Sequence, residues 1–233
     1  MGFKNNSKKK VDKNFALSIK ILNQNKIRYW ICHGTLLGII RDNQLIPWDH
    51  DIDIAVWNSD NLKDRIKKIM LNKKFVLKEK YLIEDDLLTF IKPGGREVDI
   101  NFYRKKKINN QNLAFINWFV PKNLFFKLIE AFSVGKKYRG KFKILIRSLF
   151  FLNFIFKGIK MYLIKRGYFY KSIGYTQPLN LLLNFKVLKF HRLNIKVPKN
   201  YRDYLKYIYG ENWKKPLKNY NWIKDSPSTK DLN

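Results

Sequence analysis

Within DHDIDIAVW, residues 49–57, acidic and apolar residues alternate from Asp51 to Ile54 before an apolar run. Successive side chains of a β-strand point to opposite faces, so Asp51 and Asp53 project from one face while the isoleucines after them point into a core. Two carboxylates this close repel each other and raise each other's pKa unless a divalent cation neutralises them. The segment therefore predicts a half-buried strand with a metal site, and oxygen-only ligands favour Mg²⁺ or Mn²⁺.

A second alternating segment, REVDINFY at residues 96–103, places Asp99 on the polar face of another strand. Adjacency of the two strands would join Asp99 to Asp51 and Asp53 in one cluster. Three carboxylates suit metal-dependent phosphoryl transfer, in which ions neutralise the transferred phosphate and orient the acceptor oxygen. We therefore predict Asp51, Asp53 and Asp99 as catalytic residues and metal ligands, with Asp99 nearest the acceptor as base or bridging ligand. Asp49, two residues before Asp51, either extends this acidic edge or lies in the loop that follows Pro47-Trp48.

A Gly34-Thr35 break separates the apolar strand-like run Tyr29–Cys32 from a short predicted helix that ends at Arg41. The free N–H groups in a helix's first turn bind phosphate; Gly34 permits close approach and Thr35 adds a hydroxyl. Arg41 can hold a phosphate through two parallel hydrogen bonds. Gly34, Thr35 and Arg41 are therefore the predicted donor phosphate-binding residues. His33 is either a general base or, as the favoured interpretation, a satisfied core histidine.

The rest of the chain mixes helices with single strands and hairpins. Helical periodicity predicts further helices over residues 11–27, 59–71 and 201–208, the last with Gly210 as its cap. Strand patterns occur at residues 75–78, 87–91 and 96–103, with Pro93-Gly94-Gly95 turning the chain between the last two as a hairpin. This order predicts an α+β (mixed α/β) fold with a mixed sheet flanked by helices.

The Phe-rich segment 142–164 has two competing interpretations. Its longest stretch without a charge, residues 148–156, is nine residues long, whereas about 20 are needed to span a bilayer. On a helical wheel its basic residues share one broad arc, as an interfacial membrane helix requires: Lys143, Arg147, Lys157 and Lys160. The other interpretation is a buried helix or a partner interface.

Charge and cysteine content limit the partners and the compartment. The chain has 48 Lys and Arg residues against 18 Asp and Glu residues, a formal charge of +30, which attracts nucleic acid, anionic lipid or phosphorylated substrates unless it is simply a solvated basic surface. The single cysteine, Cys32, excludes a disulfide framework within the chain and favours a reducing compartment. The basic N-terminus lacks the apolar run of a signal peptide, so we expect a cytoplasmic protein, with peripheral contact at the inner face of an anionic membrane.

The string HGTLLGIIRDNQLIPWDHDIDIAVW, residues 33–57, resembles the signature of the LicD family, which includes phosphocholine transferases of bacterial surface glycans and the animal fukutin and fukutin-related proteins. REVDINFY resembles the later carboxylate strand of that family, and VPKNYRDYL with IYGENW resembles its closing element. The resemblance extends from about residue 30 to 216, with residues 104–184 poorly matched. It implies a polymerase-β-type nucleotidyltransferase fold with an α-helical extension.

The resemblance also implies a reaction. A phospho-alcohol, such as phosphocholine or ribitol phosphate, would pass from a CDP-linked donor to a hydroxyl of a cell-surface glycan or lipid-linked saccharide, releasing CMP, as in lipopolysaccharide biosynthesis. The same positions would carry it: Asp51, Asp53 and Asp99 as metal ligands, Gly34, Thr35 and Arg41 as phosphate contacts, and Asp49 as auxiliary acid. The lone cysteine departs from the cysteine-built zinc element of fukutin-related protein and, with the absence of an N-terminal anchor, favours the bacterial-type, cytoplasmic branch.

On this interpretation residues 1–222 form one LicD-type domain with a Phe-rich helical insertion or subdomain at about 121–172, and residues 223–233 form a flexible tail. Two alternatives are a nucleotidyltransferase acting on RNA or a small molecule, and a non-enzymatic basic protein that binds membranes or nucleic acid. The string LIPWDHDID argues against the first of these, and nucleic acid is not the expected partner.

Overall fold

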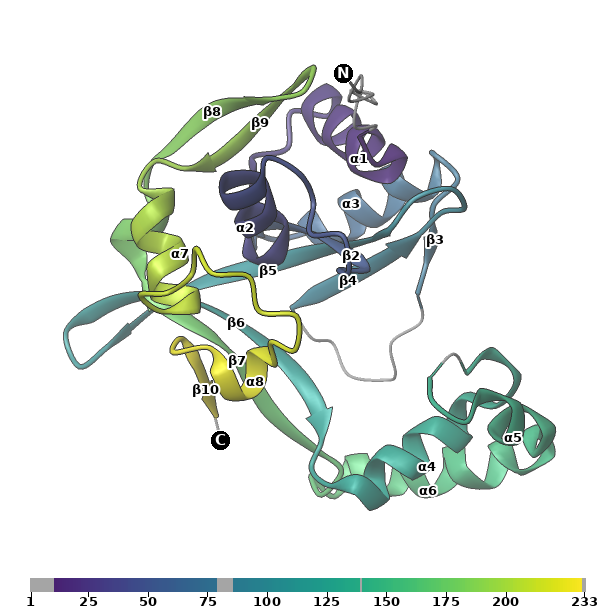
Figure 1. The fold of residues 1–233 in the computed structure, drawn as a ribbon. Coiled ribbons are helices and arrows are strands. Elements are labelled where there is room, and N and C mark those ends of the chain that lie inside the picture. Colours follow the sequence, from purple (N-terminus) through teal and green to yellow (C-terminus); the bar gives the residue numbers. More distant parts are fainter. Residues whose placement is uncertain (1–10, 79–85, 139, 232–233) are drawn as a thin grey trace, which may run out of the picture. The chain divides into compact units, whose positions relative to one another are not determined.

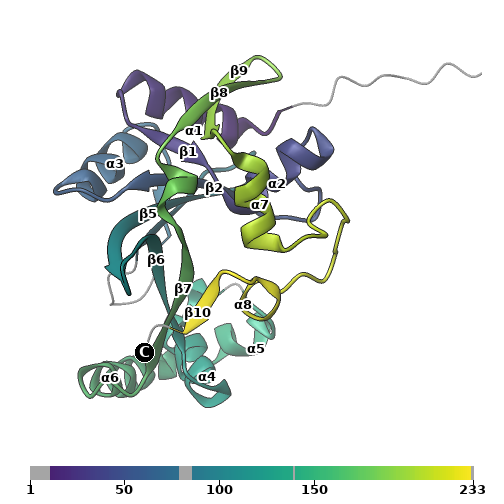
Figure 2. The same ribbon diagram turned by 90° about the vertical axis from the view of Figure 1, so that its left-hand side faces the viewer.

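The computed structural model describes residues 11–78, 86–138 and 140–231, and the chain divides into two compact units (Figures 1 and 2). The core unit comprises the described parts of residues 1–116 and 175–230, and the helical unit comprises those of residues 117–174 and 231–233. Residues 1–10, where the sequence predicts no membrane anchor, lie outside the described residues.

The core unit is built on a mixed sheet with the strand order β1-β2-β5-β6-β7-β10. β1 is antiparallel to β2, β2 is parallel to β5, and β4 is antiparallel to both β3 and β5. The predicted mixed sheet and the β4–β5 hairpin are therefore confirmed. The strands are β1 (Tyr29–Ile31), β2 (Asp51–Trp57), β3 (Val76–Leu77), β4 (Leu87–Ile91), β5 (Glu97–Ile108), β6 (Gln111–Pro121), β7 (Tyr170–Pro178) and β10 (Thr229–Asp231).

The alternating patterns determine which face of β2 and β5 is buried. Ile52 and Ile54 of β2 are fully buried, as are Val98 and Ile100 of β5. Because the two strands run parallel and in register, their apolar residues share one core and their polar residues share the opposite face. The adjacency on which the three-carboxylate prediction depends is thus confirmed.

Helices flank the sheet of the core unit. The predicted first helix is confirmed: Phe15 and Leu22 are fully buried, and the Asp12 carboxylate caps the helix by accepting from the N–H groups of Asn14 and Phe15 at 2.8 and 3.0 Å. The predicted Gly210 cap is confirmed as well, with a φ of 82°. The elements are α1 (Lys13–Gln24), α2 (His33–Asp42), α3 (Leu62–Leu71), α7 (Tyr201–Tyr209) and α8 (Trp222–Asp225), with the hairpin β8 (Phe185–Phe190) and β9 (Leu193–Pro198) and the 3₁₀ turn η3 (Leu179–Leu182).

The C-terminal segment differs from the flexible tail expected over residues 223–233. Its described residues include the end of α8 and the strand β10. The hydroxyl of Ser226 donates to the Ile208 carbonyl at 2.7 Å, and that of Thr229 donates to the Trp222 carbonyl at 2.8 Å. Polar composition misleads here because these hydroxyls bind backbone groups of the core unit in place of water.

The helical unit consists mainly of two helices that pack side by side, α4 (Leu124–Val134) and α6 (Asn153–Lys165) (Figure 1). Phe132 and Phe156 stack between them with ring centroids 4.9 Å apart. Shorter elements join them: η1 (Gly135–Lys137), α5 (Lys143–Ser148) and η2 (Phe150–Leu152). Within the described residues, no helix has both the length and the apolar character needed to cross a bilayer.

The single helical wheel drawn over residues 142–164 is wrong in one respect. The chain breaks at η2, so α5 and α6 turn their side chains independently. Lys160, which the wheel placed on the charged arc, is fully buried and pairs with Glu130 at 3.3 Å. The break removes the conflict of one continuous helix, in which Phe150 and Phe154 would share the arc of the cations.

Candidate metal and phosphate site

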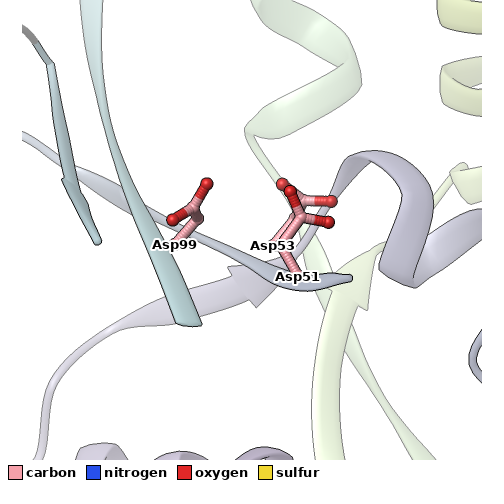
Figure 3. A group of neighbouring side chains, drawn as sticks. All are labelled: Asp51, Asp53 and Asp99. Carbon is pink, nitrogen blue, oxygen red and sulfur yellow. The ribbon is translucent and has the colours of Figure 1, made fainter. Parts of the chain in front are cut away.

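Three carboxylates converge on the polar face of the sheet (Figure 3). Asp51 and Asp53 project from β2, and Asp99 lies directly opposite Asp53 on β5. One oxygen from each carboxylate lies within 4.8 Å of the other two. The structure thus brings together the three residues that the sequence predicts as metal ligands.

The electrostatics of this cluster are those of crowded, partly buried acids. Burial raises the pKa of Asp53 well above its ordinary value of 3.8, and the charges of Asp51, Asp49 and Asp99 raise it further. The pKa of Asp51 rises to about 7, mainly through burial and then through the charge of Asp49. Without a cation these groups resist ionisation, and a divalent ion would relieve both the burial cost and the repulsion.

Asp49 lies in the loop before β2 and approaches the first turn of α2. A Cβ atom added to Gly34 would lie 2.5 Å from Oδ2 of Asp49 and 3.6 Å from Oδ2 of Asp53. The missing side chain of Gly34 therefore lets the start of the helix and the two carboxylates come close together. The predicted proximity of Gly34 and Asp49 to the acidic pair is observed, and their roles remain predictions.

Thr35 connects α2 directly to β2. Its hydroxyl oxygen accepts a hydrogen bond from the Asp53 N–H at 2.7 Å, and the residue is buried. The helix begins at His33, three residues earlier than predicted, so Gly34 and Thr35 lie inside its first turn. Through this bond the first turn of α2 is fixed beside Asp53, whose carboxyl pKa is raised well above its ordinary value, mainly by burial.

Arg41 lies at the far end of the same helix. Seven residues separate it from Gly34, which corresponds to about 10 Å along a helix axis. Its guanidinium makes two hydrogen bonds to the Asp42 carboxylate, at 2.9 and 2.7 Å. The structure therefore does not gather Gly34, Thr35 and Arg41 around one point, and a phosphate contact by Arg41 remains a prediction.

His33 is a core residue, which is the interpretation that the sequence favours. Its Nε2 lies 3.1 Å from the Tyr103 hydroxyl, and its ring stacks on Tyr175 with centroids 4.6 Å apart. Burial lowers the pKa of His33 to about 3, so the ring stays neutral.

Sequence reasoning missed two tyrosines near the cluster. The charge of Asp53 adds to the effect of burial in raising the pKa of both Tyr175 on β7 and Tyr209 on α7. These residues are more than 120 positions from Asp53 in the sequence, and no local spacing links them to it. The return of β7 to the same sheet brings Tyr175 near, and the packing of α7 against α2 brings Tyr209 near.

Comparison with known proteins gives a family match over this part of the chain. Residues 26–128 match the model described as LicD/FKTN/FKRP, nucleotidyltransferase domain. The ribitol-5-phosphate transferase FKTN of Homo sapiens is 22% identical over 214 residues, which cover 91% of this chain and 35% of FKTN. The ribitol 5-phosphate transferase FKRP of Homo sapiens is 38% identical over 42 residues, which cover 18% of this chain and 8% of FKRP.

A bacterial relative and one solved structure complete the comparison. The uncharacterized protein RT0683 of Rickettsia typhi is 29% identical over 108 residues, 46% of this chain and 32% of the relative. The chain thus spans about a third or less of the length of these curated relatives. The solution structure of the antibiotic-resistance factor ANT(2'')-Ia matches 66% of this chain and 91% of its own with 11% identity and a TM-score of 0.31.

Proposed function

The chain belongs to the LicD family through residues 26–128, and from that premise we propose that it is a metal-dependent transferase of phosphate-containing groups. In the full proposal it moves a phospho-alcohol, such as phosphocholine or ribitol phosphate, from a CDP-linked donor to a hydroxyl of a glycan or lipid-linked saccharide. The observation that carries the proposal is the convergence of Asp51, Asp53 and Asp99 beside the first turn of α2.

The donor set of this site fits a hard divalent cation. Asp51, Asp53 and Asp99 offer only oxygen atoms, which suits Mg²⁺ or Mn²⁺ better than softer metals. The raised pKa values of Asp51 and Asp53 show that burial and neighbouring acids disfavour their charged forms, so a bound ion would displace protons and stabilise the two carboxylates. When bound, the ion would supply charge neutralisation for the transferred phosphate.

The proposed reaction is a displacement at phosphorus. The acceptor hydroxyl oxygen forms a bond to the phosphorus that carries the alcohol, and the bond from that phosphorus to the CMP oxygen breaks. The hydroxyl proton passes to the Asp99 carboxylate, which lies on β5 at the side of the cluster away from α2. Asp51 and Asp53 hold the donor side, and Asp99 orients and deprotonates the acceptor.

The first turn of α2 is the proposed contact for the donor phosphates. The N–H groups of Gly34 and Thr35 lie in this turn, where a helix favours negative charge. Asp49 stands at the edge of the cluster and modulates its charge. Arg41 would have to release Asp42 to bind a phosphate and would then contact a part of the donor about 10 Å from Gly34.

We further propose that the reaction takes place on the cytoplasmic side, at the inner face of the membrane where lipid-linked saccharides are accessible. The acceptor is then a membrane-bound or newly built glycan. Nucleic acid is not part of this proposal.

A donor screen tests the activity. Purified protein with Mg²⁺ is incubated with CDP-choline, CDP-ribitol, UDP-sugars or nucleoside triphosphates, and CMP release and thermal stabilisation are measured. We expect stabilisation and slow CMP release with a CDP-alcohol, and loss of both in Asp51→Asn. Stabilisation by triphosphates alone, with pyrophosphate release in the presence of RNA or a small molecule, would replace the proposal with a nucleotidyltransferase activity.

A further inference from the structure

The helical unit carries an unusual combination of exposed apolar and basic side chains. Two thirds of the large hydrophobic side chains that the structure exposes lie in residues 124–168, about a fifth of the chain. Ile144 of α5 is 81% exposed and Phe154 of α6 is 70% exposed. Exposed apolar surface at this density marks an interaction site in a folded protein.

Each of the two main helices exposes apolar side chains on the side that does not pack against the other helix. On α4 the exposed positions include Leu124, Phe125 and Leu128, one turn of a single face. On α6 the buried Lys160 marks the inner face, and the opposite arc carries Phe154, Ile155, Ile159 and Tyr162. The interior is already filled by Phe132, Phe156 and Ile129, so these outer residues add nothing to the packing between the helices.

The charge of this unit is one-sided. Residues 117–174 contain thirteen Lys and Arg residues and one acidic residue, Glu130. Glu130 is neutralised inside the unit, because its carboxylate lies 3.3 Å from Nζ of the buried Lys160 and accepts from the Tyr170 hydroxyl at 2.9 Å. Exposed cations such as Lys143, Lys157 and Lys165 therefore have no carboxylate of this segment as a partner.

We propose that the outer surface of α4, α5 and α6 docks the protein on an anionic lipid bilayer, with the Phe, Leu and Ile side chains entering the headgroup boundary and the lysines contacting lipid phosphates. Interfacial helices combine these two residue classes. The 13 residues of α6 are too few for the roughly 20 that a span requires, so the helix lies on the surface.

The chemistry favours lipid over nucleic acid. Both partners are anionic, but binding of single-stranded nucleic acid depends on aromatic side chains that stack on the bases. Exposed Leu and Ile side chains such as Leu128, Ile144 and Ile155 have no stacking face and gain free energy only by leaving water. This inference does not depend on the proposed transferase activity.

Flotation of the full chain with vesicles tests the proposal. Vesicles of pure phosphatidylcholine are compared with vesicles containing about one third phosphatidylglycerol. The wild type should bind the anionic vesicles at least tenfold better, with binding that falls as salt rises. Equal binding to both vesicles, unaffected by salt, would overturn the proposal.

Two pairs of matched variants separate the apolar and charge contributions. Ile144→Ser/Phe154→Ser should weaken vesicle binding about tenfold or more, whereas Val187→Ser/Leu217→Ser, at positions 60% and 62% exposed in the core unit, should not. Lys143→Glu/Lys157→Glu should lower the affinity for anionic vesicles at least about fivefold per site. Lys189→Glu/Lys215→Glu has the same net charge but changes the core unit, and it should lower that affinity much less.

Two further outcomes would overturn the inference. One is tight binding of a short RNA that the two helical-unit variants abolish while vesicle binding stays weak. The other is self-association without vesicles, measured by sedimentation, that Ile144→Ser/Phe154→Ser removes. CMP release with a water-soluble acceptor is followed in parallel, and its retention in all four variants keeps failure of docking distinct from failure of the transferase.

Discussion

The core unit gathers partly buried charges of the same sign, whereas the helical unit pairs a buried charge with one of the opposite sign. In the core unit Asp51, Asp53 and Asp99 lie together, and burial and the charges of neighbouring acids raise the pKa of the first two. In the helical unit the buried cation Lys160 lies beside the single acid of residues 117–174, Glu130. A buried pair of opposite charges is typical of a structural role, whereas a cluster of like charges with raised pKa values is typical of a functional site.

The largest effect is expected at Asp53. Asp53→Asn removes a carboxylate from the proposed metal site without changing its size, and turnover should fall about a thousandfold or more. Because the charge of Asp53 is disfavoured by burial and by three acidic neighbours, the variant without metal should be at least as stable as the wild type. CMP release and thermal unfolding in EDTA measure the two effects. A marked loss of stability would show that the acidic cluster is structural.

Asp99 tests the division of labour within the cluster. Asp99→Asn should lower turnover about a hundredfold, because the acceptor loses its base, while affinity for the CDP-alcohol changes only a few-fold. Calorimetry with Mg²⁺ and single-turnover CMP release give the two quantities. Equal losses in both would make Asp99 a ground-state metal ligand, and no loss in either would remove it from the site.

Lys160 tests the other half of the comparison. Lys160→Met leaves the half-buried Glu130 without its cation and should lower the free energy of unfolding by about 2 kcal/mol. Lys160→Met/Glu130→Gln should recover most of that loss, since a neutral pair of similar volume carries no desolvation cost. Neither variant should alter CMP release per folded molecule. A double variant less stable than the single one would contradict the assignment of this pair to packing.

The pH dependence of stability tests the Asp51 carboxyl directly. The pKa of Asp51 is about 7 in the folded protein against an ordinary value of 3.8, so the folded state holds a proton that the unfolded state has lost. This contribution to stability is present below about pH 4 and is lost as pH rises to about 7. The stability of the wild type relative to Asp51→Asn, in EDTA, should therefore fall across that range. Stabilisation by Mg²⁺ should increase over the same range, because the ion displaces the proton.

Much of the candidate site could be predicted from sequence because its information is local. Alternation in residues 49–57 and 96–103 determined the buried faces of β2 and β5, and the structure confirmed their adjacency. The first helix was predictable for the same reason, since its buried residues recur at helical spacing.

The features that sequence reasoning did not find depend on tertiary context. The break at η2 and the burial of Lys160 follow from the packing of α6 against α4. A helical wheel of one segment carries no information about such neighbours. Arg41 pairs with its own neighbour Asp42, and Tyr175 reaches the site through a strand far along the chain. The C-terminal residues form β10 because an edge of the sheet is available to them.

Mn²⁺ binding followed by electron paramagnetic resonance tests the central claim most directly, because it needs neither donor nor acceptor. Wild-type protein should bind Mn²⁺ in competition with Mg²⁺, and Asp51→Asn and Asp53→Asn should each weaken binding at least tenfold. Asp64→Asn, at an exposed carboxylate on α3, is the matched control and should bind as the wild type does. Equal Mn²⁺ affinity in all four proteins would contradict the assignment of Asp51, Asp53 and Asp99 as a metal site.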